Sequence, residues 1–305
     1  MSEGRDEPAL RALRDAAGDL LLDVHSDSDH HRSVLTLCSA RSSGSPGALA
    51  GEASEAIRQA LVAAAQRIAT TAVGIVDLRG HEGAHPRLGS LDVVPFVSLR
   101  RDEGGRVRNG PLHEAVAARN DFMRFAASEL GLPCFFYGPE RSLPDVRRNA
   151  FRTLGPDAGP PVPHPTAGSC AVGARPLLIA YNLWLSGAGH GDGDEDEDRD
   201  SAERGLEIAR SIARALRGPA VRALGLRVGS HVQVSINLID PLRTGPESVY
   251  DLAARLAEME GSGIERAELV GLAPMQVVVD STRHRLAELG LDEEHTIEAR
   301  LETRQ

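Results

Sequence analysis

The sequence has few cysteines. Only Cys38, Cys134 and Cys170 occur among 305 residues, far apart and odd in number. No Cys-x-x-Cys pair exists, so neither a thiolate zinc site nor a dithiol redox centre of that type is indicated. Free thiols in a reducing compartment are the simplest interpretation, and we therefore expect a cytoplasmic protein.

Long apolar runs are also absent. No window approaches 18 uninterrupted apolar residues, and the N-terminus has no basic region followed by an apolar stretch. We therefore expect no transmembrane helix and no signal peptide. The formal charge of −10 argues against nucleic acid or an anionic membrane as the main partner. Much of this charge lies in the acidic, Gly-rich stretch 187–201, which predicts a solvated loop without the ligand spacing of a calcium site.

Several nucleotide and hydrolase motifs are missing as well. No Gly-x-Gly-x-x-Gly opens a helix after a strand, no Walker loop is present, and no Gly-x-Ser-x-Gly elbow occurs. A nicotinamide-binding fold, a P-loop enzyme and a serine hydrolase of the elbow type are therefore unsupported.

The pattern of apolar residues predicts an α+β protein with two related halves, each a sheet with helices on one face. Helices are expected at 8–18, 52–70, 111–130, 143–151, 202–217, 245–260 and 274–289. Strands are expected at 20–24, 33–40, 93–97, 132–138, 176–185, 224–240 (a pair with a turn) and 268–272. The Pro- and Gly-rich residues 155–175 predict a long loop, and a loop of this length is usually functional or disordered.

The stretch 81–96, HEGAHPRLGSLDVVPF, is the most informative. His81 and His85 stand four residues apart, and Pro86 biases His85 away from helical geometry. Polar groups that lead into an apolar strand are typical of a site at a strand mouth. The plain alternative is a surface loop with satisfied histidines.

Two kinds of chemistry fit these histidines. Asp23 and His25, on one side of a predicted strand, could join His81 and His85 in a zinc or iron site. Arg32 would place a positive charge beside such a cation, and we predict that no metal is bound. Alternatively, a histidine beside a carboxylate-binding cleft is a proton shuttle near neutral pH. Three arginines could bind carboxylates bidentately there: Arg87, Arg147 and Arg175.

At this point the sequence resembles the formiminotransferase family over almost its whole length. SEGRD (2–6), DVHSDSDHHRSVLTL (23–37) and the histidine stretch resemble PNxSEGRD, DVHADxDHNRSVxT and HKGEHPRMGATDVVPF. Residues 157–185 resemble DFGP…HPxxGxxxxGARPFLxAYNxNL, while HVQVSINLID (231–240) and ELVGLAP (268–274) resemble xxQVSxNLxD and EIVGLVP. Several long motifs in the right order make this resemblance specific.

The resemblance implies transfer of a formimino group from N-formimino-L-glutamate to tetrahydrofolate, the co-substrate, in histidine breakdown. It implies a homodimer of chains with two ferredoxin-like subdomains, mainly antiparallel sheets with helices on one face. The expected boundaries of the two subdomains are 1–178 and 179–305. The family's first strand has no counterpart in this sequence, and our hypothesis is that Met1 lies downstream of the true start. The cyclodeaminase half of the bifunctional relatives is not expected here.

The resemblance also implies the site residues. His85 is the expected acid–base catalyst, and no metal is required. The folate loop is expected at Gly159, Pro160, Pro161, Val162, Pro163, His164, Pro165, Thr166, Ala167 and Gly168. Further substrate contacts are expected from His25, Arg32, Arg87, Asp92, Arg147 and Arg175.

Some positions depart from the family pattern. Glu82 and Ala84 stand where the family has Lys and Glu, and His31 stands where it has Asn. The residues 149–151, Asn-Ala-Phe, replace Gly-Glu-Tyr. Two alternatives therefore stay open beside formimino transfer. One is a reduced-folate-binding protein with lost or altered chemistry, and the other is a related enzyme acting on 5-formyltetrahydrofolate.

Overall fold

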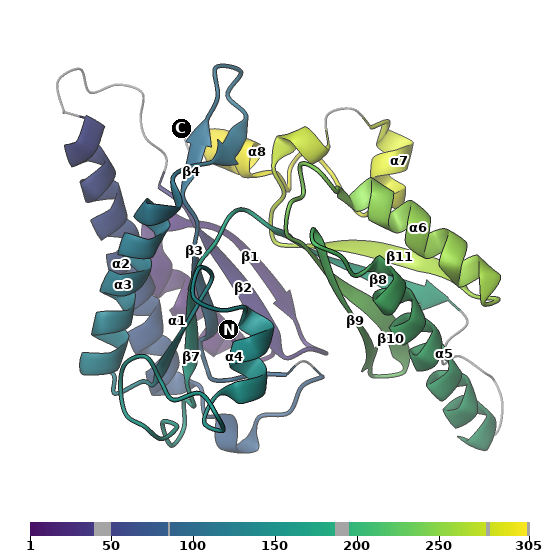
Figure 1. Ribbon diagram of the computed structural model, residues 1–305, viewed down its shortest axis with the longest axis horizontal. Helices are drawn as coiled ribbons and strands as arrows, with labels where there is room; N and C mark the ends of the chain where they lie inside the picture. The colour runs from purple at the N-terminus through teal and green to yellow at the C-terminus, as the bar shows by residue number, and fades with distance from the viewer. Residues whose placement is uncertain (40–49, 85, 187–194, 279–280, 304–305) are drawn as a thin grey trace. The chain divides into compact units, whose positions relative to one another are not determined.

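A computed structural model describes residues 1–39, 50–84, 86–186, 195–278 and 281–303. The chain forms two compact units. The first unit holds Met1–Leu99 and Asn109–Arg175, and the second holds Arg100–Arg108 and Pro176–Gln305 (Figure 1). Both units combine helices with sheets, and antiparallel strand pairs occur in each, which confirms the α+β class.

The first unit contains two small sheets. Strands β1 (Leu21–Asp27) and β2 (Arg32–Leu37) pair antiparallel, and β3 (Asp92–Phe96), β7 (Cys170–Ala174) and β6 (Cys134–Tyr137) pair in parallel in that order. The helices are α1 (Glu7–Ala17), α2 (Ala50–Ile75), α3 (Leu112–Ser128) and α4 (Leu143–Asn149), with 3-10 turns at Gly18–Leu20 and Leu78–Gly80. The core lies between α1, α2, α3 and the sheets, around Leu13, Ile68, Phe122, Cys134 and Val172.

The N-terminal residues connect the two sheets of the first unit. The backbone N–H of Ser33, in β2, donates to the carbonyl of Met1, and that of Ser2 donates to the carbonyl of Ser90. The hydroxyl of Ser2 also donates to the Gly89 carbonyl at 2.8 Å. Residues 1–3 are therefore tied both to β2 and to the segment that leads into β3.

Helix α1 shows how local sequence sets an element. The Asp6 carboxylate caps the helix by accepting from the Ala9 N–H, and Pro8 occupies the first turn, where its missing N–H is not needed. Gly18 ends the helix with a φ of +60°. The capped helix buries Leu10 and Leu13 and directs residues 1–6 toward β2.

The second unit is a four-stranded antiparallel sheet in the order β11-β8-β10-β9. Its elements are β8 (Ile179–Ser186), α5 (Glu195–Leu216), β9 (Val221–Val228), β10 (His231–Leu238), α6 (Pro246–Met259) and β11 (Gly263–Val270). This βαββαβ order is the expected ferredoxin-like arrangement. A 3-10 turn at Met275–Val277, α7 (Arg283–Glu288) and α8 (Ile297–Glu302) follow.

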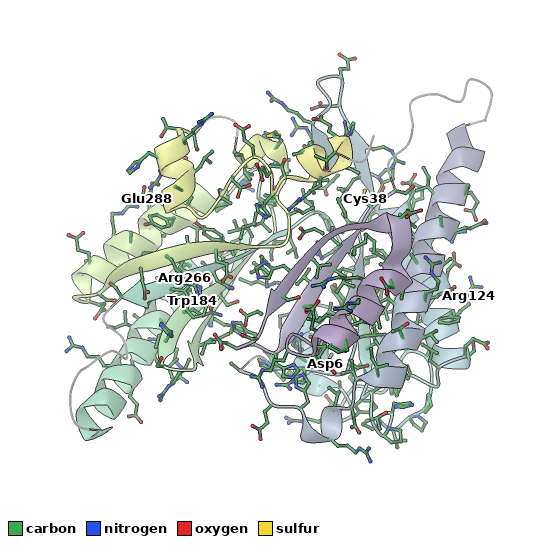
Figure 2. The ribbon with its side chains drawn as sticks, turned by 180° about the vertical axis from the view of Figure 1, so that it is seen from behind. Asp6, Cys38, Arg124, Trp184, Arg266 and Glu288 are labelled. Carbon is green, nitrogen blue, oxygen red and sulfur yellow. The ribbon has the colours of Figure 1, made fainter. Side chains whose placement is uncertain are left out.

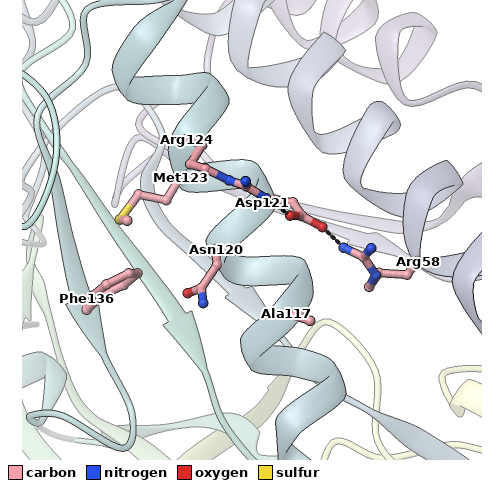
Figure 3. Close-up of a pocket in the computed structure, with 7 residues that line it drawn as sticks. All are labelled: Arg58, Ala117, Asn120, Asp121, Met123, Arg124 and Phe136. Atoms are coloured by element: carbon pink, nitrogen blue, oxygen red, sulfur yellow. Dashed lines mark hydrogen bonds and ion pairs between the residues drawn. The ribbon is translucent and has the colours of Figure 1, made fainter.

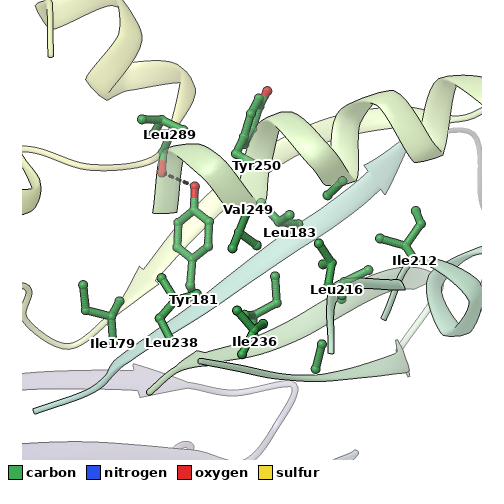
Figure 4. Close-up of a cluster of buried hydrophobic side chains, with 14 of the residues drawn as sticks. Ile179, Tyr181, Leu183, Ile212, Leu216, Ile236, Leu238, Val249, Tyr250 and Leu289 are labelled. Atoms are coloured by element: carbon green, nitrogen blue, oxygen red, sulfur yellow. Dashed lines mark hydrogen bonds between the residues drawn. The ribbon is translucent and has the colours of Figure 1, made fainter. Parts of the chain in front are cut away.

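Alternation along β8 separates the two faces of this sheet. The odd-numbered residues Ile179 to Leu185 pack against α5 and α6 through Ile212, Leu216 and Val249 (Figure 4). The Tyr181 hydroxyl donates to the Leu289 carbonyl at 2.7 Å, so the one polar atom of this ring is satisfied inside the core. The even-numbered residues of β8 lie on the opposite face.

Three sequence predictions need correction. Residues 170–174, predicted as loop, form the strand β7 between β3 and β6. This strand is built from small residues because its neighbours are close. A Cβ at Gly173 would collide with the Tyr137 ring. Residues 195–201, predicted in the acidic loop, belong to α5, while 187–194 lie outside the described residues. The predicted helix at 274–289 is instead a 3-10 turn and α7, which begins where the Thr282 side chain accepts from the Arg285 N–H.

Two elements were not predicted. Strands β4 (Leu99–Arg101) and β5 (Val107–Asn109) form a hairpin, and the Val107 N–H donates to the buried carboxylate of Glu298 in α8. The same carboxylate accepts from the Met275 N–H at 2.8 Å.

None of the helices that the structure describes is long and apolar enough to span a membrane.

Candidate active site

The histidine stretch forms an ordered approach to β3. His85 itself lies outside the described residues, and the segments on both sides of it are described. The Arg87 guanidinium donates to the carbonyls of His81 at 3.0 Å and Gly83 at 2.6 Å, which ties residues 81–83 to Arg87. Burial and the nearby Arg32 charge lower the pKa of Arg87.

Asp92 is the central charged group of this site. It is fully buried, has a φ of +55° and accepts from the Leu88 N–H at 2.7 Å. Its Oδ2 accepts from Nη2 of Arg32 at 2.5 Å and from Nη2 of Arg147 at 2.7 Å. Burial alone would raise the pKa of Asp92, but the Arg32 and Arg147 charges outweigh it and lower this pKa well below its usual range. The carboxylate is therefore ionised and paired.

The same two arginines hold the backbone next to position 85. Nη1 of Arg147 donates to the Pro86 carbonyl at 2.8 Å, and Nη1 of Arg32 donates to it at 3.2 Å. Arg32 begins β2 and Arg147 lies on α4, so two distant elements converge on one peptide. Arg87 lies near this pair, since the Arg32 charge acts on it, so three guanidinium groups gather around the segment that leads into β3.

The predicted folate loop packs directly against this stretch. The Ser90 N–H donates to the Ala167 carbonyl at 2.9 Å, and the Ser169 N–H donates to the Leu88 carbonyl at 3.0 Å. Gly89 is required at this contact, because a Cβ there would lie 2.6 Å from the Ala167 carbonyl oxygen. The structure thus brings together two segments that are about 80 residues apart in sequence.

Within the loop, His164 organises the backbone. Its Nδ1 accepts from the Ala167 N–H at 3.1 Å, and His164 and Gly168 exchange two backbone hydrogen bonds. Gly168 has a φ of +67°, which favours glycine. The prolines and Gly159 precede this turn, and Val162 at its tip is 63% exposed.

Two predicted contacts lie elsewhere. Arg175 follows Ala174, the last residue of β7, which pairs with Phe96. Asp92 pairs with Cys170, the first residue of β7, and the two ends of this strand are about 13 Å apart. Burial lowers the pKa of Arg175, opposed by its hydrogen bond with Tyr137. His25 pairs with Val34 in the β1–β2 ladder. The structure therefore gathers Arg32, Arg87, Asp92 and Arg147, while Arg175 contacts Tyr137.

Sequence reasoning missed Glu3 as a member of this site. Its side chain is almost fully buried, and Oε1 accepts from the backbone N–H groups of Gly4, Arg5 and Asp6 at 2.8 to 2.9 Å. Its carbonyl accepts from the Ser33 hydroxyl at 2.6 Å. The SEGRD motif was the available signal, because an acidic residue between Ser and Gly in a short motif indicates a specific backbone turn.

A second polar cluster lies on the face of the second unit's sheet away from α5 and α6. Glu268 Oε2 accepts from the Trp184 indole N–H at 3.1 Å and from the Asn182 amide at 3.3 Å. The Arg266 guanidinium lies over the Trp184 ring, 4.1 Å from its centroid (Figure 2). Trp184 stands where the family pattern has Asn, and the indole N–H is held by a carboxylate.

A shallow pocket of about 530 Å³ lies on the first unit between α2, α3 and β6. Arg58 and Asp121 form an ion pair at its rim, and Met123 and Phe136 supply its apolar wall (Figure 3). None of its lining residues belongs to the cluster around Asp92. In the described ranges, no three His, Cys, Asp or Glu side chains are grouped as metal ligands.

Known proteins resemble this chain over most of its length. Residues 1–175 match the family described as "Formiminotransferase domain, N-terminal subdomain". A glutamate formimidoyltransferase of Thermoplasma acidophilum is 30% identical over 329 residues, covering 99% of this chain and 95% of the relative. One of Streptococcus pyogenes serotype M1 is 29% identical, covering 93% and 90%.

A bifunctional relative extends the comparison. The formimidoyltransferase-cyclodeaminase of Gallus gallus is 30% identical over 320 residues, which is 97% of this chain but only 53% of the relative. The chain therefore spans about half the length of the bifunctional relatives. The chain belongs to the formiminotransferase family, and this membership makes it a transferase.

Proposed function

We propose that this protein transfers the formimino group of N-formimino-L-glutamate to tetrahydrofolate, giving 5-formiminotetrahydrofolate and glutamate. The observation that carries the proposal is the contact between residues 164–169 and residues 88–90. It unites the loop expected to bind folate with the segment that follows His85. Two substrates held side by side are what a bimolecular transfer needs.

The charge of the site supports anionic substrates. Both formiminoglutamate and folate carry carboxylates, and the site holds three guanidinium groups, those of Arg32, Arg87 and Arg147. We propose that these guanidinium groups contact substrate carboxylates. Contacts from His25 and Arg175 stay predictions from the resemblance.

The proposed reaction needs one proton carrier. The N5 nitrogen of tetrahydrofolate attacks the formimino carbon and forms a new C–N bond. N5 then loses a proton, the glutamate nitrogen gains one, and the C–N bond to glutamate breaks. His85 is proposed to take the first proton and deliver the second. No metal or nicotinamide takes part in these steps.

The second candidate is transfer from 5-formyltetrahydrofolate, which shares the folate loop and differs in the other substrate. The departures from the family pattern at Glu82 and Ala84, close to His85 in sequence, support a further alternative, a folate-binding protein without transfer activity. We further propose a cytoplasmic homodimer with a role in histidine breakdown, on the family resemblance. Sedimentation of the purified chain tests the dimer.

The test is a transfer assay on the purified chain. Formiminoglutamate and tetrahydrofolate are mixed with it, and free glutamate and 5-formiminotetrahydrofolate are measured. Equal, enzyme-dependent release of both products is expected. If the chain instead forms tetrahydrofolate only when 5-formyltetrahydrofolate and glutamate are supplied, the second candidate replaces the proposal. Saturable folate binding without any transfer would overturn both.

A further inference from the structure

Two histidine rings meet where the turn between β1 and β2 touches the loop 81–87. The ring centroids of His31 and His81 lie 3.9 Å apart with a tilt of 49°. Both ring nitrogens of His81 and Nδ1 of His31 are buried and have no hydrogen-bond partner among the described residues. Leaving a buried polar atom unpaired costs about 1–3 kcal/mol, so packing alone does not explain this pair.

The backbone of His31 adds a second cost. Its φ is +50°, in the left-handed region, which residues other than glycine rarely adopt. Such outliers persist where surrounding structure holds them. Oε1 of Glu3 lies 3.7 Å from Nδ1 of His31. Because three backbone N–H groups fix this carboxylate, it provides a rigid reference for the His31 ring.

The loop lies directly on the turn at Gly83. A Cβ at position 83 would lie 2.5 Å from the His30 carbonyl oxygen and 3.1 Å from the Cβ of His31. On its other side, the Gly83 carbonyl accepts from Arg87. Glycine is therefore needed at position 83 for the close contact with the β1–β2 turn. The His31 ring makes a second contact between the two segments, with the ring of His81.

We propose that His31 is a positioning residue: its ring, beside Glu3, contacts His81 and so fixes residues 81–84, which directly precede the proposed catalyst His85. This rests on the proposed function for the role of His85 and extends it. His31 touches no substrate in this account. It acts through His81, four residues before His85, while Arg32 and Arg147 fix the following carbonyl of Pro86.

The proposal also accounts for three departures together. The family pattern has Asn at position 31, Lys at 82 and Glu at 84, whereas this chain has His31, Glu82 and Ala84. A ring contact with His81 requires a ring at position 31. The His31–His81 pair therefore supplies a local contact in a loop that has lost two charged groups of the family pattern. The three positions are expected to behave as one coupled set.

The first experiment changes the ring and keeps the backbone. His31→Asn retains a residue that tolerates left-handed geometry, and His284→Asn, on the exposed face of α7, is the matched control. Hydrogen exchange of the peptide covering 81–88 is followed by mass spectrometry. Exchange is expected to quicken in His31→Asn and in His81→Asn, and to be unchanged in His284→Asn. Unchanged exchange in His31→Asn would overturn the proposal.

The second experiment reads the reaction. His31→Asn is expected to lower kcat about tenfold with little change in KM, because the loop is misplaced while binding groups remain. Adding Glu82→Lys and Ala84→Glu to this variant is expected to recover most of kcat. A kcat equal to that of the unchanged chain would overturn the proposal. If the unchanged chain transfers nothing, the proposed function fails, and the exchange measurement still decides whether His31 seats the loop.

Discussion

Nη2 of Arg147 lies 2.7 Å from Oδ2 of Asp92, and Nη1 of the same arginine lies 2.8 Å from the Pro86 carbonyl oxygen. One planar guanidinium thus joins a buried carboxylate to the peptide that follows position 85. Lysine cannot reproduce this fork, because its ammonium is a single point charge on a flexible stem. The relationship makes Arg147 a test of how strictly the loop must be held.

Arg147→Lys is expected to lower kcat for transfer roughly tenfold and the free energy of unfolding by about 1–3 kcal/mol. The neighbouring Arg148→Lys is the control, since its side chain is 70% exposed and pairs with Asp145 on the same helix. Steady-state kinetics and urea unfolding measure the two effects. Equal behaviour of the two variants would contradict the role given to Arg147.

Asp92→Asn is expected to destabilise the protein by about 3 kcal/mol at pH 7, because two guanidinium groups lose their buried counter-charge. The folded-state pKa of Asp92 is lowered, so its contribution is present above the unfolded pKa of about 3.9 and is lost as pH falls through the folded pKa. Urea unfolding at pH 7, 4 and 3 should show the gap between the two proteins narrowing in acid. A gap that stays constant from pH 7 to 3 would speak against an ionised Asp92.

Gly89→Ala is expected to disrupt the contact between the folate loop and the histidine stretch. The added Cβ would meet backbone atoms of Ala167 and Ser169, which cannot rotate away, at a cost of about 2 kcal/mol or more. Gly155→Ala is the matched control, since a Cβ there meets nothing within 4 Å. Thermal unfolding and titration with 5-formyltetrahydrofolate compare the variants. Tight folate binding by Gly89→Ala would show that the contact is dispensable.

The fold could be predicted well where apolar periodicity was strong. The segments that became α1, α3 and β8 were foreseen because each buries one regular face. Strand β7 escaped, since Cys170–Ala174 is short, contains Gly173 and lies beside a Pro-rich loop. This segment forms a strand because it pairs with β3 and β6, which are its neighbours in the sheet but are distant from it in sequence.

The candidate site was partly predictable for a similar reason. Motif resemblance located Asp92, Arg32 and Arg147, but nothing in the sequence indicates that both arginines share the Pro86 carbonyl. The buried Glu3 and the His31–His81 contact depend on tertiary packing between segments about 30 to 50 residues apart. Spacing within a motif cannot report such contacts.

The cysteines provide a further prediction. Burial, with a smaller effect of Asp157, raises the pKa of the Cys134 thiol to about 12, and burial raises that of Cys170 well above its usual value. Both thiols are therefore protonated at pH 8 and slow to react. Alkylation of the folded protein, followed by peptide mass spectrometry, is expected to label the half-buried Cys38 first. Labelling of Cys134 at the rate of Cys38 would contradict this burial.

The central claim is that His85 carries the proton in a folate-dependent formimino transfer. The most direct measurement compares the unchanged chain with His85→Ala for glutamate release from formiminoglutamate and for binding of 5-formyltetrahydrofolate. The account predicts that His85→Ala loses transfer by a factor of about 10² or more and binds the folate nearly as tightly as before. Transfer at an undiminished rate by His85→Ala would contradict it.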